Sequence, residues 1–100
     1  MTQSAEPAPK GRVLVVDDDA SLAEMLTIVL RQEGFDSRVC ARGDEALAAF
    51  RAFHPDVVLL DLNLPKKDGR EVLAEIKADD ALRRIPVVIL TTPQDERDIL

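Results

Sequence analysis

The sequence contains no tryptophan and no tyrosine, and its aromatic residues are three phenylalanines. Because hydrophobic residues still make up 46% of its 100 residues, the core must be built mostly from aliphatic side chains. No apolar run reaches the length of a transmembrane helix, and the first residues lack the apolar stretch of a signal peptide. We therefore expect one small cytoplasmic domain that makes no contact with a membrane.

Cysteine is also scarce, and acidic residues outnumber basic ones. Cys40 is the single cysteine, so the chain forms no internal disulfide, and we expect this side chain to be a small buried residue in a strand. The formal net charge is −6, from 19 acidic and 13 basic residues. Because nucleic acids are bound through basic surfaces, we expect this domain to make no contact with nucleic acid. A metal cation or a basic protein surface is the better partner.

Three short aliphatic runs end in side chains that carry oxygen. They are residues 13–16 before Asp17, Asp18 and Asp19, residues 57–60 before Asp61, and residues 87–90 before Thr91 and Thr92. Such runs are typical of buried parallel strands, whose carboxyl ends meet at one edge of the sheet. We expect the acidic groups to converge there and to bind a divalent metal, a combination that suits phosphoryl chemistry.

The remaining pattern alternates strands with helices. We expect a disordered leader over residues 1–11, strands at 12–17, 35–40, 56–60 and 87–90, helices at 20–33, 43–53 and 68–79, and a further helix with Thr92 as N-cap. The mixed polarity of the second strand predicts a place at the sheet edge, and residues 80–85 read as a polar connection. Regular alternation predicts right-handed crossovers and therefore a parallel α/β sheet with helices on both faces.

Residues 12–100 resemble the receiver domain of two-component response regulators. The family's acidic pair stands here as Asp17 and Asp18, its D-x-N-x-P-x-x-D-G loop begins at Asp61, and its switch hydroxyl stands as Thr91. The resemblance implies a flavodoxin-like (CheY-like) doubly wound sheet with strand order 2-1-3-4. The family's fifth strand, lysine-proline pair and fifth helix would follow Leu100, so we expect them to be missing from this chain.

The resemblance also implies a function. Asp61 would accept a phosphoryl group from a sensor histidine kinase or a phosphotransfer protein, and the phosphoryl group would switch a protein-interaction surface. Asp18, Asp61 and the backbone carbonyl of Asn63 would coordinate Mg²⁺, with Asp17 acting through bound water, and Thr91 would hydrogen-bond a phosphoryl oxygen. Such a domain is a phosphoacceptor rather than an enzyme, with at most slow self-catalysed dephosphorylation.

Simpler interpretations exist for several of these residues. An acidic run before a helix can serve as its N-cap, and we expect Asp19 to do only that. We interpret Gly69 as a turn former, Lys66 and Lys67 as solvated loop charges, and His54 as a surface residue. Capping does not need three consecutive aspartates, so metal binding remains the preferred role of the first two.

Two other functions remain open. In a haloacid-dehalogenase-like phosphohydrolase a strand-end aspartate is the nucleophile, but a second acid is expected where Asn63 stands. In a structural or interaction fragment, residues 87–90 would form an unpaired strand edge that favours homo-association, and the first helix would lose part of its cover. The segment before residue 36 resembles receivers of winged-helix transcription factors, and the segment after residue 58 resembles standalone receivers of phytochrome-type kinases, which leaves a chimeric chain open.

Overall fold

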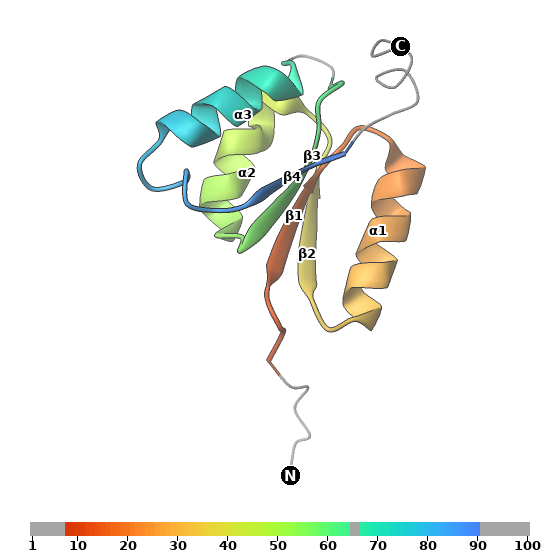
Figure 1. Ribbon diagram of the computed structural model, residues 1–100. Helices are drawn as coiled ribbons and strands as arrows, with labels where there is room; N and C mark the ends of the chain where they lie inside the picture. The colour runs from red at the N-terminus through yellow and green to blue at the C-terminus, as the bar shows by residue number, and fades with distance from the viewer. Residues whose placement is uncertain (1–7, 65–66, 91–100) are drawn as a thin grey trace.

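A computed structural model describes residues 8–64 and 67–90 (Figure 1). Its elements are β1 (Arg12–Val16), α1 (Ala20–Gln32), β2 (Asp36–Cys40), the 3₁₀ turn η1 (Gly43–Glu45), α2 (Ala46–Phe53), β3 (Val57–Asp61), α3 (Gly69–Ala78) and β4 (Val87–Leu90). The four strands are parallel in the order β2-β1-β3-β4, which confirms the predicted topology. Figure 1 shows α1 on one side of the sheet and α2 and α3 on the other.

Strand β1 lies inside the sheet because both of its faces are apolar. Val13 and Val15 point toward the α1 side, where they pack with Ala23. Leu14 and Val16 point to the opposite side and join the main core with α2 and α3. These four side chains are 2% exposed or less, which is why the sequence shows an unbroken apolar run instead of an alternating one.

The outer strands are less buried. β2 forms one edge, as its mixed polarity predicted, and Cys40 at its end is 7% exposed. Burial raises the pKa of the Cys40 thiol, in keeping with its predicted structural role. β4 pairs with β3 alone among the described residues.

The ends of the helices follow the cap residues that the sequence offers. The Leu22 N–H donates to Oδ1 of Asp19 at 3.0 Å, so Asp19 is the N-cap of α1. The Arg70 N–H donates to Oδ1 of Asp68 at 2.7 Å, so Asp68 is the N-cap of α3. Gly34 follows α1 with φ +92°, a left-handed conformation that glycine adopts without strain. The two capped helices therefore begin close to the ends of β1 and β3.

Three details differ from the sequence-based expectation. Lys10 N–H donates to Gly34 O, and Gly11 O accepts from Asp36 N–H, so pairing begins within the segment assigned to the leader. The connection after α3 is not simply polar, because Leu82 is 7% exposed and belongs to the core. The expected helix from Thr92 lies outside the described residues.

Helix α1 buries only part of its apolar surface against the sheet. Leu26 and Leu30 pack against the strands, whereas Met25, Ile28 and Val29 are about half exposed at 54%, 46% and 48%. The sequence analysis predicted that part of this helix would lack cover. Within the described residues, no helix is long and apolar enough to cross a membrane.

Candidate metal centre

Three carboxylates meet at the carboxyl edge of the sheet. Carboxylate oxygens of Asp17, Asp18 and Asp61 all lie within 4.8 Å of one another. The register of the central strands explains this, because Val16 of β1 pairs with Leu60 of β3 and each chain then continues into an aspartate. The predicted convergence of the three acids is therefore present in the structure.

Two of these carboxylates are buried. Asp17 is 2% exposed and Asp61 is 4% exposed, whereas Asp18 is exposed to solvent. Burying a carboxylate is costly unless hydrogen bonds or a cation compensate for the lost hydration. Asp17 and Asp18 form no ion pair with a basic side chain of residues 8–64 or 67–90. This concentration of anionic oxygen fits a hard divalent cation.

Main-chain N–H groups orient both buried carboxylates. Oδ1 of Asp17 accepts from the N–H of Asp19 at 2.9 Å, and Oδ1 of Asp61 accepts from the N–H of Asn63 at 3.0 Å. Each bond reaches two residues along the chain, so both strands end in the same kind of turn closed by an aspartate. Asn63 thus contacts the site through its N–H, and the role predicted for its carbonyl oxygen remains a prediction.

Glycine lets helix α3 approach the site closely. A Cβ at position 69 would lie 2.4 Å from the carbonyl oxygen of Asp61 and 2.5 Å from Cα of Leu62. The Gly69 N–H also donates to the Leu62 carbonyl at 2.9 Å. Gly69 is not among the residues with positive φ, so it is needed for a close backbone approach and not for the turn that the sequence suggested.

A second glycine supports the same loop and was missed by the sequence analysis. A Cβ at Gly43 would lie 1.9 Å from the Lys67 carbonyl oxygen, so η1 packs directly against the loop between β3 and α3. The only local signal is a glycine at the start of a predicted helix, and that signal does not reveal a contact with a segment more than twenty residues away.

The structure can also be compared with the roles expected for Lys67 and His54. Lys67 is not a solvated charge, because its ammonium pairs with Glu75 on α3 and its side chain is 25% exposed. His54 is exposed, as predicted, in a left-handed conformation with φ 54° that ends α2 before Pro55. Lys66 and Thr91 lie outside the described residues.

Comparison with known proteins identifies the family. The family model described as response regulator receiver domain matches residues 13–100. The chain belongs to this family. The receiver domain is 54% identical over 89 residues to the DNA-binding response regulator MtrA of Mycobacterium tuberculosis. That match covers 89% of this chain and 38% of MtrA, so the chain spans well under half of that relative.

Solved receiver structures agree with the fold. The Mn²⁺-bound form of response regulator Rcp1 is 40% identical and superposes with a TM-score of 0.77, over 89% of this chain and 70% of that one. The phosphorylated cyanobacterial phytochrome response regulator RcpA is 42% identical, with a TM-score of 0.77 and the same coverage. The family assignment favours a receiver over the phosphohydrolase and the unphosphorylated fragment.

Proposed function

We propose that this receiver domain, comprising residues 12–100, accepts a phosphoryl group on Asp61 from a phosphohistidine of a sensor histidine kinase or phosphotransfer protein. The observation that carries the proposal is the convergence of three carboxylates within 4.8 Å at the ends of β1 and β3. Phosphorylation would then shift the domain between two states of a protein-interaction surface.

The chemistry requires a carboxylate held in place and a means of neutralising charge. A carboxylate oxygen of Asp61 attacks phosphorus, the bond from phosphorus to the imidazole nitrogen breaks, and the imidazole leaves with that electron pair. The product is an acyl phosphate on Asp61. The Asn63 N–H, which donates to Oδ1 of Asp61, fixes the orientation of the carboxylate before attack.

A divalent cation fits the donor set, because three carboxylates at this edge of the sheet supply only anionic oxygen. Mg²⁺ would offset the repulsion between the nucleophile and the phosphoryl oxygens. Asp18, Asp61 and the Asn63 carbonyl would hold the ion directly, and Asp17 would act through bound water. The Mn²⁺-bound form of Rcp1 supports a metal in this role, and Mg²⁺ is our proposal for this chain.

Thr91 is proposed to bind a phosphoryl oxygen. The strand register pairs Asp61 with Leu90, and Thr91 follows Leu90 in the sequence. A hydroxyl group at that position would lie next to the end of β3, where Asp61 stands. It would donate its proton to a phosphoryl oxygen and stabilise the phosphorylated state.

The test is phosphorylation by a small donor. Incubation of the chain with acetyl phosphate and Mg²⁺ should add the mass of one phosphoryl group, as measured by intact-mass spectrometry. Asp61→Asn should abolish the addition, and omission of Mg²⁺ should slow it strongly. Asp36→Asn, at the opposite edge of the sheet, is the matched control and should retain full labelling. A phosphoryl group that still appears on the Asp61→Asn chain would refute the assignment.

We also propose that copies of this 100-residue chain associate with one another. The supporting observations are the half-exposed Val88 on β4, at 48%, and the half-exposed apolar residues of α1.

A further inference from the structure

Lys67, which lies just before helix α3, is held from two sides. Its carbonyl oxygen lies against η1, where a Cβ at Gly43 would be 1.9 Å away, and its ammonium group pairs with Glu75 on α3. The Lys67 side chain is 25% exposed. A main-chain contact and an ion pair therefore attach this one residue to two different elements.

The ion pair differs from a contact between two fully solvated charges. Oε1 of Glu75 is buried and forms no hydrogen bond within the described segments, while Oε2 meets the Lys67 ammonium group. A carboxylate that has lost part of its hydration depends on its cation, because removal of that partner leaves a partly desolvated charge. The Glu75 side chain is still 40% exposed overall, so we expect a moderate effect and not that of a fully buried pair.

The start of α3 connects Lys67 to the acceptor aspartate. Lys67 precedes Asp68, the N-cap of α3, and Gly69 follows. The Gly69 N–H donates to the Leu62 carbonyl at 2.9 Å, and a Cβ at Gly69 would lie 2.4 Å from the carbonyl oxygen of Asp61. Because the main chains pack so closely there, a shift of Lys67 that moves Gly69 also moves Asp61.

We propose that the pair of Lys67 and Glu75 positions the acceptor: it fixes the start of α3 against Asp61 and thereby sets the affinity of the carboxylate cluster for a divalent cation. The two residues act through the main chain and belong neither to the proposed ligands nor to the reacting groups, as supporting residues around a metal site commonly do. This inference rests on the metal centre of the proposed function and does not require phosphoryl transfer itself.

The opposite charges of the pair allow positioning to be separated from electrostatics. Lys67→Met removes a positive charge, so a purely electrostatic effect would tighten Mg²⁺ binding, whereas Glu75→Met removes a negative charge and would weaken it. Loss of positioning weakens Mg²⁺ binding in both variants, because the same attachment is broken. The double variant should then bind Mg²⁺ no more weakly than either single variant, since one attachment is lost only once.

The experiment measures the Mg²⁺ dissociation constant of the folded chain and its variants by isothermal titration calorimetry. Lys67→Met and Glu75→Met should each raise the constant by about threefold. Gly43→Ala changes no charge, but its Cβ would displace the Lys67 carbonyl, so it should raise the constant as well. If Gly43→Ala does not fold, Lys67→Met decides alone.

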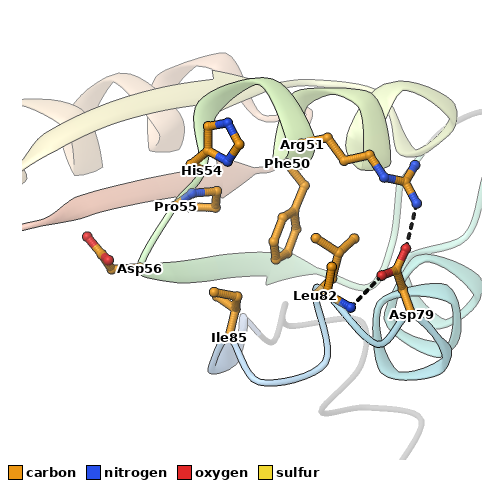
Figure 2. A pocket seen from close by; sticks show the side chains of 9 residues that line it. Phe50, Arg51, His54, Pro55, Asp56, Asp79, Leu82 and Ile85 are labelled. Carbon is orange, nitrogen blue, oxygen red and sulfur yellow. Dashed lines mark hydrogen bonds and ion pairs between the residues drawn. The ribbon is translucent and has the colours of Figure 1, made fainter.

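Arg51→Met is the matched control, because it removes the ion pair that Arg51 forms with Asp79 just beyond α3. Figure 2 shows this pair among the residues that line a hollow of ≈ 570 Å³, which also reaches Asp56. Asp79 lies about 15 Å along the helix from Gly69. The variant should therefore lower stability and leave the Mg²⁺ dissociation constant unchanged.

The outcomes separate this inference from the proposed metal centre. An unchanged or lower constant in Lys67→Met would overturn the inference and leave the metal centre standing. Equal rises in Arg51→Met and Lys67→Met would show that any lost ion pair weakens the site through general destabilisation, and would overturn it too. No Mg²⁺ uptake by the folded, unaltered chain would overturn the metal centre and the inference together.

Discussion

At the scale of single residues, Gly69 connects the metal centre to the helix behind it. The carbonyl of Asp61 occupies the space that a Cβ at position 69 would need, 2.4 Å away. A larger residue must therefore displace either the start of α3 or the main chain of Asp61. The glycine thus helps to position the proposed acceptor although it presents no functional group to the site.

We predict that Gly69→Ala lowers the free energy of unfolding by about 1–3 kcal/mol, the usual cost of overpacking a tight site. It should also reduce phosphorylation of Asp61 by acetyl phosphate. Gly11→Ala is the control, because the nearest atoms to a Cβ there would be the Asp56 carboxylate oxygen at 3.2 Å and two ring atoms of Phe35 at 3.7 Å. Chemical denaturation followed by circular dichroism measures both variants, and equal stability losses would contradict this account of Gly69.

At the scale of elements, aspartates at the ends of strands have two separable functions. Asp19 caps α1 through the Leu22 N–H, while Asp17 and Asp18 face the carboxylate cluster. The sequence predicted this division because capping requires only one side-chain oxygen. A comparison of neighbouring residues can therefore distinguish helix stability from metal binding.

We predict that millimolar Mg²⁺ raises the Tm of the chain by several degrees, because the ion binds the folded site alone. Asp19→Ala should lose about 1 kcal/mol of stability and keep the whole Mg²⁺ shift. Asp18→Ala should lose the shift. Thermal melts with and without Mg²⁺ measure both effects, and a full shift in the Asp18→Ala chain would exclude this carboxylate as a ligand.

The ion pair between α2 and the end of α3 gives a pH dependence of known sign. The hydrogen bond from Arg51 holds the pKa of Asp79 below its ordinary value of 3.8. A lowered folded-state pKa stabilises the protein above the unfolded-state value, and this stability is lost as the pH falls through the folded-state pKa. Arg51→Met should therefore be less stable than the unaltered chain at about pH 6, and the difference should shrink below about pH 4.

Arg83→Met is the control for this pH dependence, since its guanidinium lies 3.8 Å from an exposed Asp80 carboxylate. Its stability relative to the unaltered chain should stay constant with pH. Urea denaturation at a series of pH values gives both comparisons. A stability difference for Arg51→Met that persists unchanged at the lowest pH would show that the variant acts through packing and not through the charge of Asp79.

At the scale of the whole molecule, the sequence predicted those structural features that depend on local sequence patterns. Aliphatic runs and cap residues placed each described helix and strand to within a few residues, and strand ends placed Asp17 beside Asp61. The contact of Gly43 with Lys67, the burial of Leu82 and the hollow near Asp56 were not predicted. Each of these brings together segments distant in the chain, and hydrophobic periodicity carries no information about such contacts.

The distribution of apolar surface leads to the last prediction. Helix α1 alone covers its side of the described sheet, and Met25, Val29 and Val88 remain about half exposed at 54%, 48% and 48%. An apolar strand edge and exposed apolar side chains both favour contact with another chain.

We predict that this 100-residue chain self-associates at micromolar concentration, as measured by multi-angle light scattering and sedimentation velocity. Met25→Lys and Val88→Lys should each weaken association by about tenfold or more, because a charge buried in an apolar contact loses its hydration. Val39→Lys adds the same charge to an apolar side chain that is 42% exposed on the opposite edge strand, β2, and should leave association unchanged. A monodisperse monomer would refute association. An equal effect of Val39→Lys would mean that net charge, and not this surface, controls it.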